Sequence, residues 1–85
     1  GNNNVEVVYN AENQLKPVEG LFSILSDEDQ NGMRVAVLKL ADGAESNDVL
    51  AALISSVKLR SFKELVPRMN DIFIDLVSKD GNKDE

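Results

Sequence analysis

Apolar and polar positions alternate near the start of the chain in a way that predicts a β-strand. The apolar residues Val5, Val7 and Tyr9 take turns with Glu6, Val8 and Asn10, which indicates an edge or early strand with one apolar face. Residues 11–18 have little periodicity, contain Pro17, and are predicted to form a connection.

Two further strands are predicted to form an antiparallel hairpin. Residues 21–26 and 33–40 are rich in apolar and β-branched residues, and the stretch DEDQNG between them has turn chemistry. Asn31-Gly32 is the dipeptide that a tight two-residue turn favours, although a loop of four to six residues also fits the spacing. Residues 33–40 are apolar on both faces, which favours a central strand.

The second half of the chain predicts a helix, a strand and another helix. Ser46 is a suitable N-cap for a helix that ends near Ser55 and carries an apolar stripe of Val49, Leu50, Leu53 and Ile54. Residues 57–65 predict a fourth strand, with Val57, Leu59 and Ser61 on one side and Lys58, Arg60 and Phe62 on the other. After Pro67, Met69, Ile72, Phe73, Leu76 and Val77 recur at helical spacing.

This order of elements predicts an α+β two-layer sandwich. We expect a mostly antiparallel four-stranded sheet, in the order β-β-β-α-β-α, with two helices packed on one face. One domain is predicted at residues 5–78, preceded by a disordered or tag-derived start at 1–4 and followed by a mobile polar tail at 79–85.

Composition narrows the range of functions. The 85 residues have a net charge of −6, so their long-range field disfavours nucleic acid and anionic membrane surfaces. The absence of Cys and His removes thiolate nucleophiles, histidine bases and conventional zinc sites. No apolar run is long enough to span a bilayer, so we expect no direct membrane insertion.

Three acidic or glycine patterns are candidates for metal binding, catalysis or phosphate binding. Residues 27–32 match the first half of an EF-hand loop, but its twelfth position is Leu38 in place of the bidentate Glu, so a solvated hairpin turn is favoured over a calcium site. Asp71 and Asp75 are better explained as the polar face of a helix than as an acid and base. The five glycines form no phosphate-binding motif. We therefore predict no catalytic, cofactor-binding or metal-binding residues and no enzyme activity in this domain.

One basic cluster accompanies the fourth strand and the turn that follows it. Its members are Lys58, Arg60, Lys63 and Arg68. They are typical of exposed strand residues, and they are also the candidate contacts for an acidic partner surface.

Several segments resemble a known family. Arg60-Ser61-Phe62-Lys63-Glu64, then Pro67, then residues 71–77 (DIFIDLV) are similar to the strand, proline and closing helix of the C-terminal accessory domain in bacterial ABC-exporter ATPase subunits. Residues 40–44 (LADGA) and 47–50 (NDVL) resemble the family's strand end, turn and helix start. The resemblance extends over residues 5–77.

The resemblance implies a non-catalytic accessory or regulatory role. It implies that ATP and Mg²⁺ are held by an upstream domain, and that this domain contacts its own ATPase domain and the partner ATPase subunit, tuning their packing or dimerisation. It also implies a cytoplasmic location, peripheral to the inner membrane, in an export complex. Homodimerisation and a small-ligand-binding regulatory role at a dimer interface remain alternatives, the latter from fold analogy alone.

Overall fold

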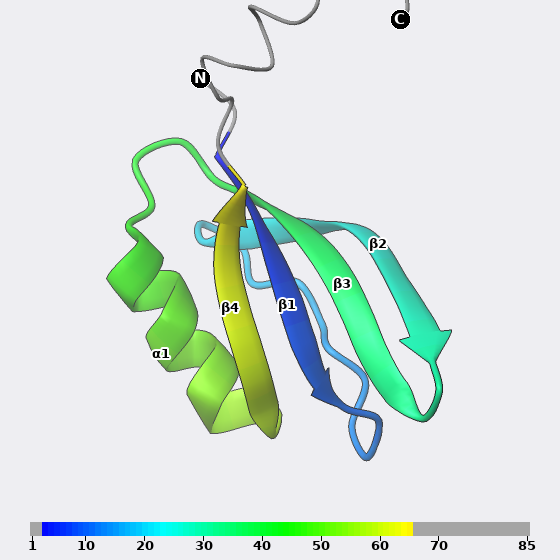
Figure 1. The fold of residues 1–85 in the computed structure, drawn as a ribbon. Helices are drawn as coiled ribbons and strands as arrows, with labels where there is room; N and C mark the ends of the chain where they lie inside the picture. Colours follow the sequence, from blue (N-terminus) through cyan, green and yellow to red (C-terminus); the bar gives the residue numbers. More distant parts are fainter. Residues whose placement is uncertain (1–2, 66–85) are drawn as a thin grey trace, which may run out of the picture.

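Four strands form a single antiparallel sheet in the computed structural model, which describes residues 3–65. The elements in chain order are β1 (Asn4–Asn10), β2 (Phe22–Gln30), β3 (Met33–Leu40), α1 (Ser46–Ser56) and β4 (Leu59–Leu65). Their order across the sheet is β2-β3-β1-β4, and each neighbouring pair is antiparallel (Figure 1).

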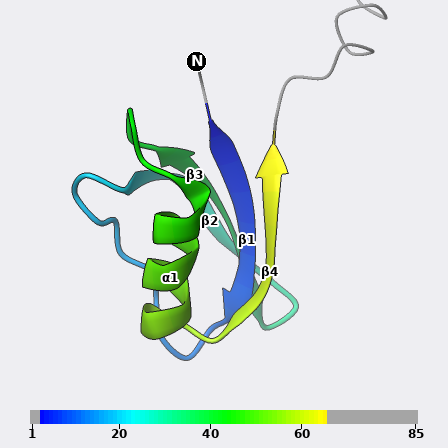
Figure 2. The ribbon, with the colours of Figure 1, turned by 90° about the vertical axis from the view of Figure 1, so that its left-hand side faces the viewer.

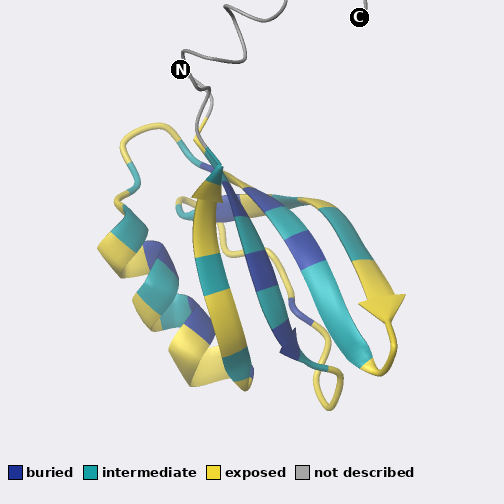
Figure 3. Ribbon diagram, in the orientation of Figure 1, coloured by how far each residue is buried: buried dark blue, intermediate teal, exposed yellow. Residues whose placement is uncertain are grey.

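The core lies on one face of this sheet. Alternate residues of β1 and β3 point to that face, because directly paired residues of antiparallel strands share a side. Helix α1 forms the second layer (Figure 2), and the residues coloured as buried lie mainly on α1 and on the central strands β1 and β3 (Figure 3). The buried residues are Val5, Val7, Tyr9, Leu15, Phe22, Ala36, Leu38, Leu40, Val49, Leu53 and Val57.

The described residues correct the predicted fold class. They contain four strands and one helix in the order β-β-β-α-β, where the sequence predicted β-β-β-α-β-α with two helices on one face. On the core face, α1 shares the cover with the 11–21 connection, whose Leu15 is 4% exposed, so part of the described cover is non-helical. The second predicted helix, the tail at 79–85 and Arg68 lie outside the described residues.

The hairpin prediction is confirmed, with the shorter of the two turns. Gln30 pairs with Met33, so the loop consists of Asn31 and Gly32 alone. Their φ angles are 57° and 85°, the pair of positive values that a type I′ turn requires. Strand β2 is also longer than predicted, because Asp27 to Gln30 pair with β3 where the sequence predicted a turn.

Strand β1 is a central strand of the sheet. It lies between β3 and β4, so the edge alternative is wrong, whereas the central position predicted for residues 33–40 is confirmed. The alternation in β1 reflects a sheet with one covered face: Val5, Val7 and Tyr9 are buried, and the residues between them are half-buried.

Both edge strands contain a β-bulge. In β2 the register shifts between Ile24 and Ser26, leaving Leu25 unpaired. In β4, Ser61 pairs with Val8 and Leu59 with Tyr9, leaving Arg60 unpaired. A bulge inserts one residue and so reverses which later residues face the core. Leu59 and Phe62, predicted on opposite sides, therefore both pack against it.

Helix α1 agrees with prediction in its extent and differs at its start and along its stripe. Glu45 occupies the N-cap without a side-chain capping bond, and Ser46 is the first helical residue. Its hydroxyl instead donates a hydrogen bond to Glu64 Oε2 (2.5 Å). Val49 and Leu53 are fully buried, but Ile54 is 62% exposed.

Candidate interaction surface

Two groups of polar side chains lie at opposite edges of the sheet. The first group begins with the bulge at Leu25. Before it, Phe22 and Ile24 face the core, and after it Asp27 and Asp29 do, as their pairings with Ala36 and Arg34 show. The bulge thereby brings a carboxylate to the side of the sheet that carries Tyr9.

Asp27 is the centre of a closed hydrogen-bond network. The Tyr9 hydroxyl donates to Asp27 Oδ2 (2.5 Å) and accepts from the Leu15 backbone N–H (3.0 Å). Arg34 Nε donates to Asp27 Oδ1 (2.8 Å), and Nη2 donates to the Asp27 carbonyl oxygen (2.9 Å). Ala36 is the residue of β3 that pairs with Asp27, and its small side chain leaves room for Tyr9 to reach across from β1.

The network is arranged for structure and not for reaction. Burial, reinforced by the hydrogen bond to Asp27, raises the pKa of Tyr9 above its ordinary value of 10.0. The hydrogen bond to Asp27 likewise raises the pKa of Arg34. Tyr9 is 0% exposed, so its hydroxyl cannot meet a substrate. The network instead fixes the 11–21 connection, through Leu15, to the bulged strand β2.

The half-matched calcium loop has a different conformation. Asp27 and Asp29 lie within extended β2, and only Asn31 and Gly32 form the turn. Asp27 is already engaged by Tyr9 and Arg34. Within residues 3–65, no group of three or more Asp, Glu, His or Cys side chains is placed to hold a metal ion.

The second polar group follows β4. Lys58, Arg60 and Lys63 are all exposed, as predicted for members of the basic cluster. Lys63 pairs with Glu6 and so lies on the face away from the core, whereas Arg60 sits in the bulge. The residues therefore flank an edge and do not form a patch on one face. The ion pair found in the described part of the chain joins Arg34 to Asp27 and involves none of these three.

An exposed apolar side chain lies beside the basic edge. Ile54 of α1 lines a shallow hollow of about 620 Å³ together with Lys58 and Leu59. Figures 1 and 2 show α1 alongside β4, on the core side of the sheet. We call the set Ile54, Lys58, Leu59, Arg60 and Lys63 the β4 edge surface.

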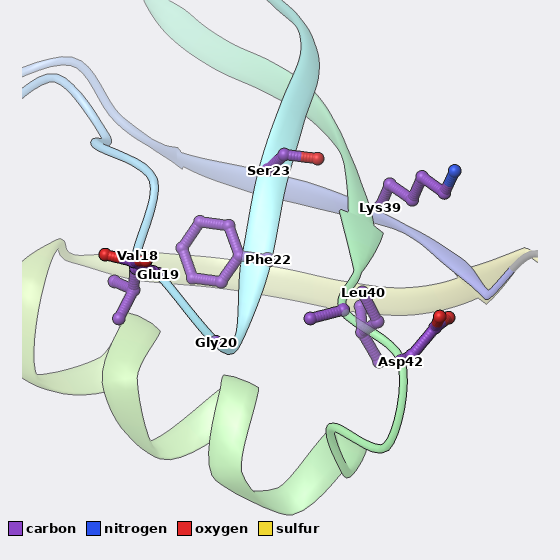
Figure 4. A pocket seen from close by; sticks show the side chains of 9 residues that line it. Val18, Glu19, Gly20, Phe22, Ser23, Lys39, Leu40 and Asp42 are labelled. Carbon is purple, nitrogen blue, oxygen red and sulfur yellow. The ribbon is translucent and has the colours of Figure 1, made fainter.

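A hollow at the other end of the sheet lacks convergent chemistry. It has a volume of about 400 Å³ and is lined by Val18, Glu19, Gly20, Phe22, Ser23, Lys39, Leu40, Ala41 and Asp42. Figure 4 shows the Phe22 ring turned toward Val18 and Glu19, while Lys39 and Asp42 extend on the other side of Phe22. A ligand site needs polar groups that point to one spot. This arrangement gives the small-ligand alternative no support.

Sequence reasoning missed both the network and the exposed part of α1. The clue to the network was Tyr9, the single tyrosine, at an apolar position where its hydroxyl needs a partner. The sequence placed Ile54 in the packed apolar stripe of α1. Its position at the margin of that stripe was the available sign that it is exposed.

Comparisons with known proteins identify the chain's relatives at the level of a family. A family model described as "ATP-binding protein DrrA1-3-like, C-terminal domain" matches residues 1–77. The searches of curated proteins and of solved structures returned no match. In residues 3–65, no helix has both the length and the apolar character needed to cross a membrane.

Proposed function

The chain belongs to the family of C-terminal domains of DrrA1-3-like ATP-binding proteins, and from this we propose that it is a non-catalytic accessory domain of an export ATPase. In this role it contacts its own upstream ATPase domain or the partner ATPase subunit. The contact tunes how the two subunits pack, dimerise and hydrolyse ATP. ATP and Mg²⁺ are held by the upstream domain, and the assembly works on the cytoplasmic side of the inner membrane.

The β4 edge surface is the observation that carries the proposal. Elsewhere in the described residues, the charges closest to the core are engaged by one another, as Asp27 and Arg34 are. At β4, by contrast, three exposed cations flank an edge, and an isoleucine that is 62% exposed lies on its α1 side. Exposed charges that surround apolar area are typical of the rim and centre of a protein interface. Lys58, Arg60 and Lys63 are the proposed contacts, together with Arg68.

The test uses the whole ATPase that carries this domain, in its transporter. The variant combines Lys58→Glu with Arg60→Glu. We expect ATP-dependent dimerisation to weaken roughly 5-fold or more, since two interface charges are reversed. Analytical ultracentrifugation measures the dimer, and phosphate release and transport assays measure hydrolysis and export.

A matched variant separates this effect from a change in net charge. Lys16→Glu with Lys39→Glu changes the total charge equally, at exposed residues of the 11–21 connection and of β3. We expect that variant to dimerise and hydrolyse ATP as the unmodified protein does. Normal dimerisation, hydrolysis and transport in an ATPase truncated before Val5 would refute the accessory role.

A further inference from the structure

Strand β4 ends the sheet on one side. Within residues 3–65 it pairs with β1 and with no other strand. An edge strand presents a row of unpaired backbone N–H and C=O groups, on which another extended chain can add as a further strand. Native sheets block such edges with bulges and lysines, and β4 has both, yet the bulge leaves Ser61 to Leu65 in regular register with β1.

The charge along this edge selects the kind of strand that could add. Residues 58–65 carry three cations, Lys58, Arg60 and Lys63, and one anion, Glu64, which accepts a hydrogen bond from Ser46. Beside them, Glu6 of β1 pairs with Lys63, and Glu12 lines the hollow next to Lys58. The segment 58–65 itself therefore has a net positive charge, although the chain as a whole has a net charge of −6. A second copy of β4 would bring like charges together across the new pair, which disfavours that occupant.

An exposed apolar side chain lies beside the same edge, on the α1 side of the sheet. Ile54 projects from α1 beside Lys58 and Leu59, and it is 62% exposed, whereas Leu53, the preceding residue of the helix, is fully buried. A strand added outside β4 would place every second side chain on the α1 side of the sheet. Apolar residues at those positions would cover Ile54.

We propose that the β4 edge surface binds an extended acidic peptide segment of the ATPase partner, which adds to the sheet as a fifth strand. Its apolar residues alternate toward α1 and cover Ile54, and its carboxylates lie near Lys63 on the opposite face and near Lys58 and Arg60 at the bulged end. This binding mode rests on the proposed function, for which it names the chemistry of the partner.

The test uses the 85-residue chain and a synthetic nine-residue peptide of alternating Glu and Val with blocked ends. Titration followed by NMR gives the dissociation constant, and hydrogen exchange reports on each backbone amide. We expect the Glu peptide to bind roughly tenfold or more tightly than a Lys/Val peptide, and to release as salt is added. The amides of β4 that point away from β1 should exchange more slowly in the complex, and those of β2 should not change.

Matched variants separate the contribution of the apolar side chain to binding from that of the cations. Ile54→Ser should weaken binding roughly 3- to 10-fold by removing apolar contact area, whereas Leu25→Ser, at a 55% exposed residue of the opposite edge, should leave it unchanged. Lys58→Glu with Arg60→Glu should abolish the preference for the Glu peptide. A peptide N-methylated at alternate residues should not bind, because it cannot complete the strand pairing.

Results of two kinds, in the complex and in the free chain, would overturn the inference. One is equal binding of the Glu and Lys peptides, or binding without protection of the outward β4 amides. The other is protection of these amides in the free chain, which would mean that the chain itself occupies the edge. If either is found while the charge reversal still weakens ATPase dimerisation, the accessory role stands and the strand-addition mode fails. If the peptide binds as expected and the reversal has no effect on the ATPase, the accessory role fails instead.

Discussion

The two edges of the sheet use their charged residues in opposite ways. At β2, a bulge turns Asp27 inward, where its carboxylate is held by Tyr9 and Arg34. At β4, a bulge leaves Arg60 unpaired and exposed, between Lys58 and Lys63. The same backbone device therefore stabilises the fold at one edge and displays charge at the other. Substitutions at the two edges should consequently affect different measurements.

The largest effect is expected at the β2 edge from Asp27→Ala. The variant removes the Asp27 carboxylate, whose side chain is 8% exposed. It therefore leaves the Arg34 guanidinium and the Tyr9 hydroxyl without their shared acceptor. We expect the free energy of unfolding to fall by about 2–4 kcal/mol, measured by urea denaturation. Glu28→Ala is the control, because Glu28 is exposed on the other face, and it should change stability by about 0.5 kcal/mol or less. Equal losses in the two variants would remove the distinction between the edges.

Tyr9→Phe tests the link between the network and the 11–21 connection. It preserves the buried ring and removes the hydroxyl that joins Asp27 to the Leu15 N–H. The cost should be about 1–3 kcal/mol, because two buried partners lose a hydrogen bond. Exchange of the Leu15 amide should become faster by more than that of the β4 amides. Uniform acceleration along the chain would show that the hydroxyl does not act through the connection.

The same variant also isolates a pH dependence. Burial and the Asp27 hydrogen bond raise the pKa of Tyr9 in the folded chain above 10.0. Below pH 10 the tyrosine is protonated in both states, so its contribution to stability is fully present. Above pH 10 the unfolded chain loses the proton first, and the free energy of unfolding falls by up to about 1.4 kcal/mol per pH unit until the folded pKa is passed.

Subtracting the Tyr9→Phe profile from that of the unmodified chain isolates the contribution of Tyr9. Because the chain has a single tyrosine, tyrosinate absorbance measures this pKa directly. A midpoint at pH 10.0 in the folded chain would contradict the effect of burial.

The contrast between the edges also marks what the sequence could predict. Local patterns predicted the hairpin, with the Asn31-Gly32 turn as one of two alternatives, the extent of α1 and the exposed cations of β4, since each depends on neighbouring residues. They could not place β1 between β3 and β4, because that pairing joins residues such as Val5 and Glu64 that are far apart in the chain. The alternation in β1 reports a covered face and says nothing of how many neighbours the strand has.

The bulges explain most of the remaining errors. Strict alternation put Leu59 and Phe62 on opposite faces, and one unpaired residue, Arg60, brings both to the core. In β2, the shift at Leu25 converts an apparent calcium ligand, Asp27, into the partner of Tyr9. A bulge depends on how two strands fit together, so the sequence of one strand does not reveal it. Ile54 stays exposed for a related reason, because the sheet ends at β4 and no described strand lies beyond it.

The smallest effect on stability is expected at the β4 edge, and it completes the comparison. In the isolated chain, Lys58→Glu with Arg60→Glu should change the free energy of unfolding by about 0.5 kcal/mol or less, since neither side chain has an ion-pair partner among residues 3–65. Urea denaturation beside Asp27→Ala measures the contrast under one condition. A loss as large as that of Asp27→Ala would mean that the cations hold the fold together. A negligible loss, combined with weaker ATPase dimerisation, would mean that they act on a partner, because only binding would then depend on them.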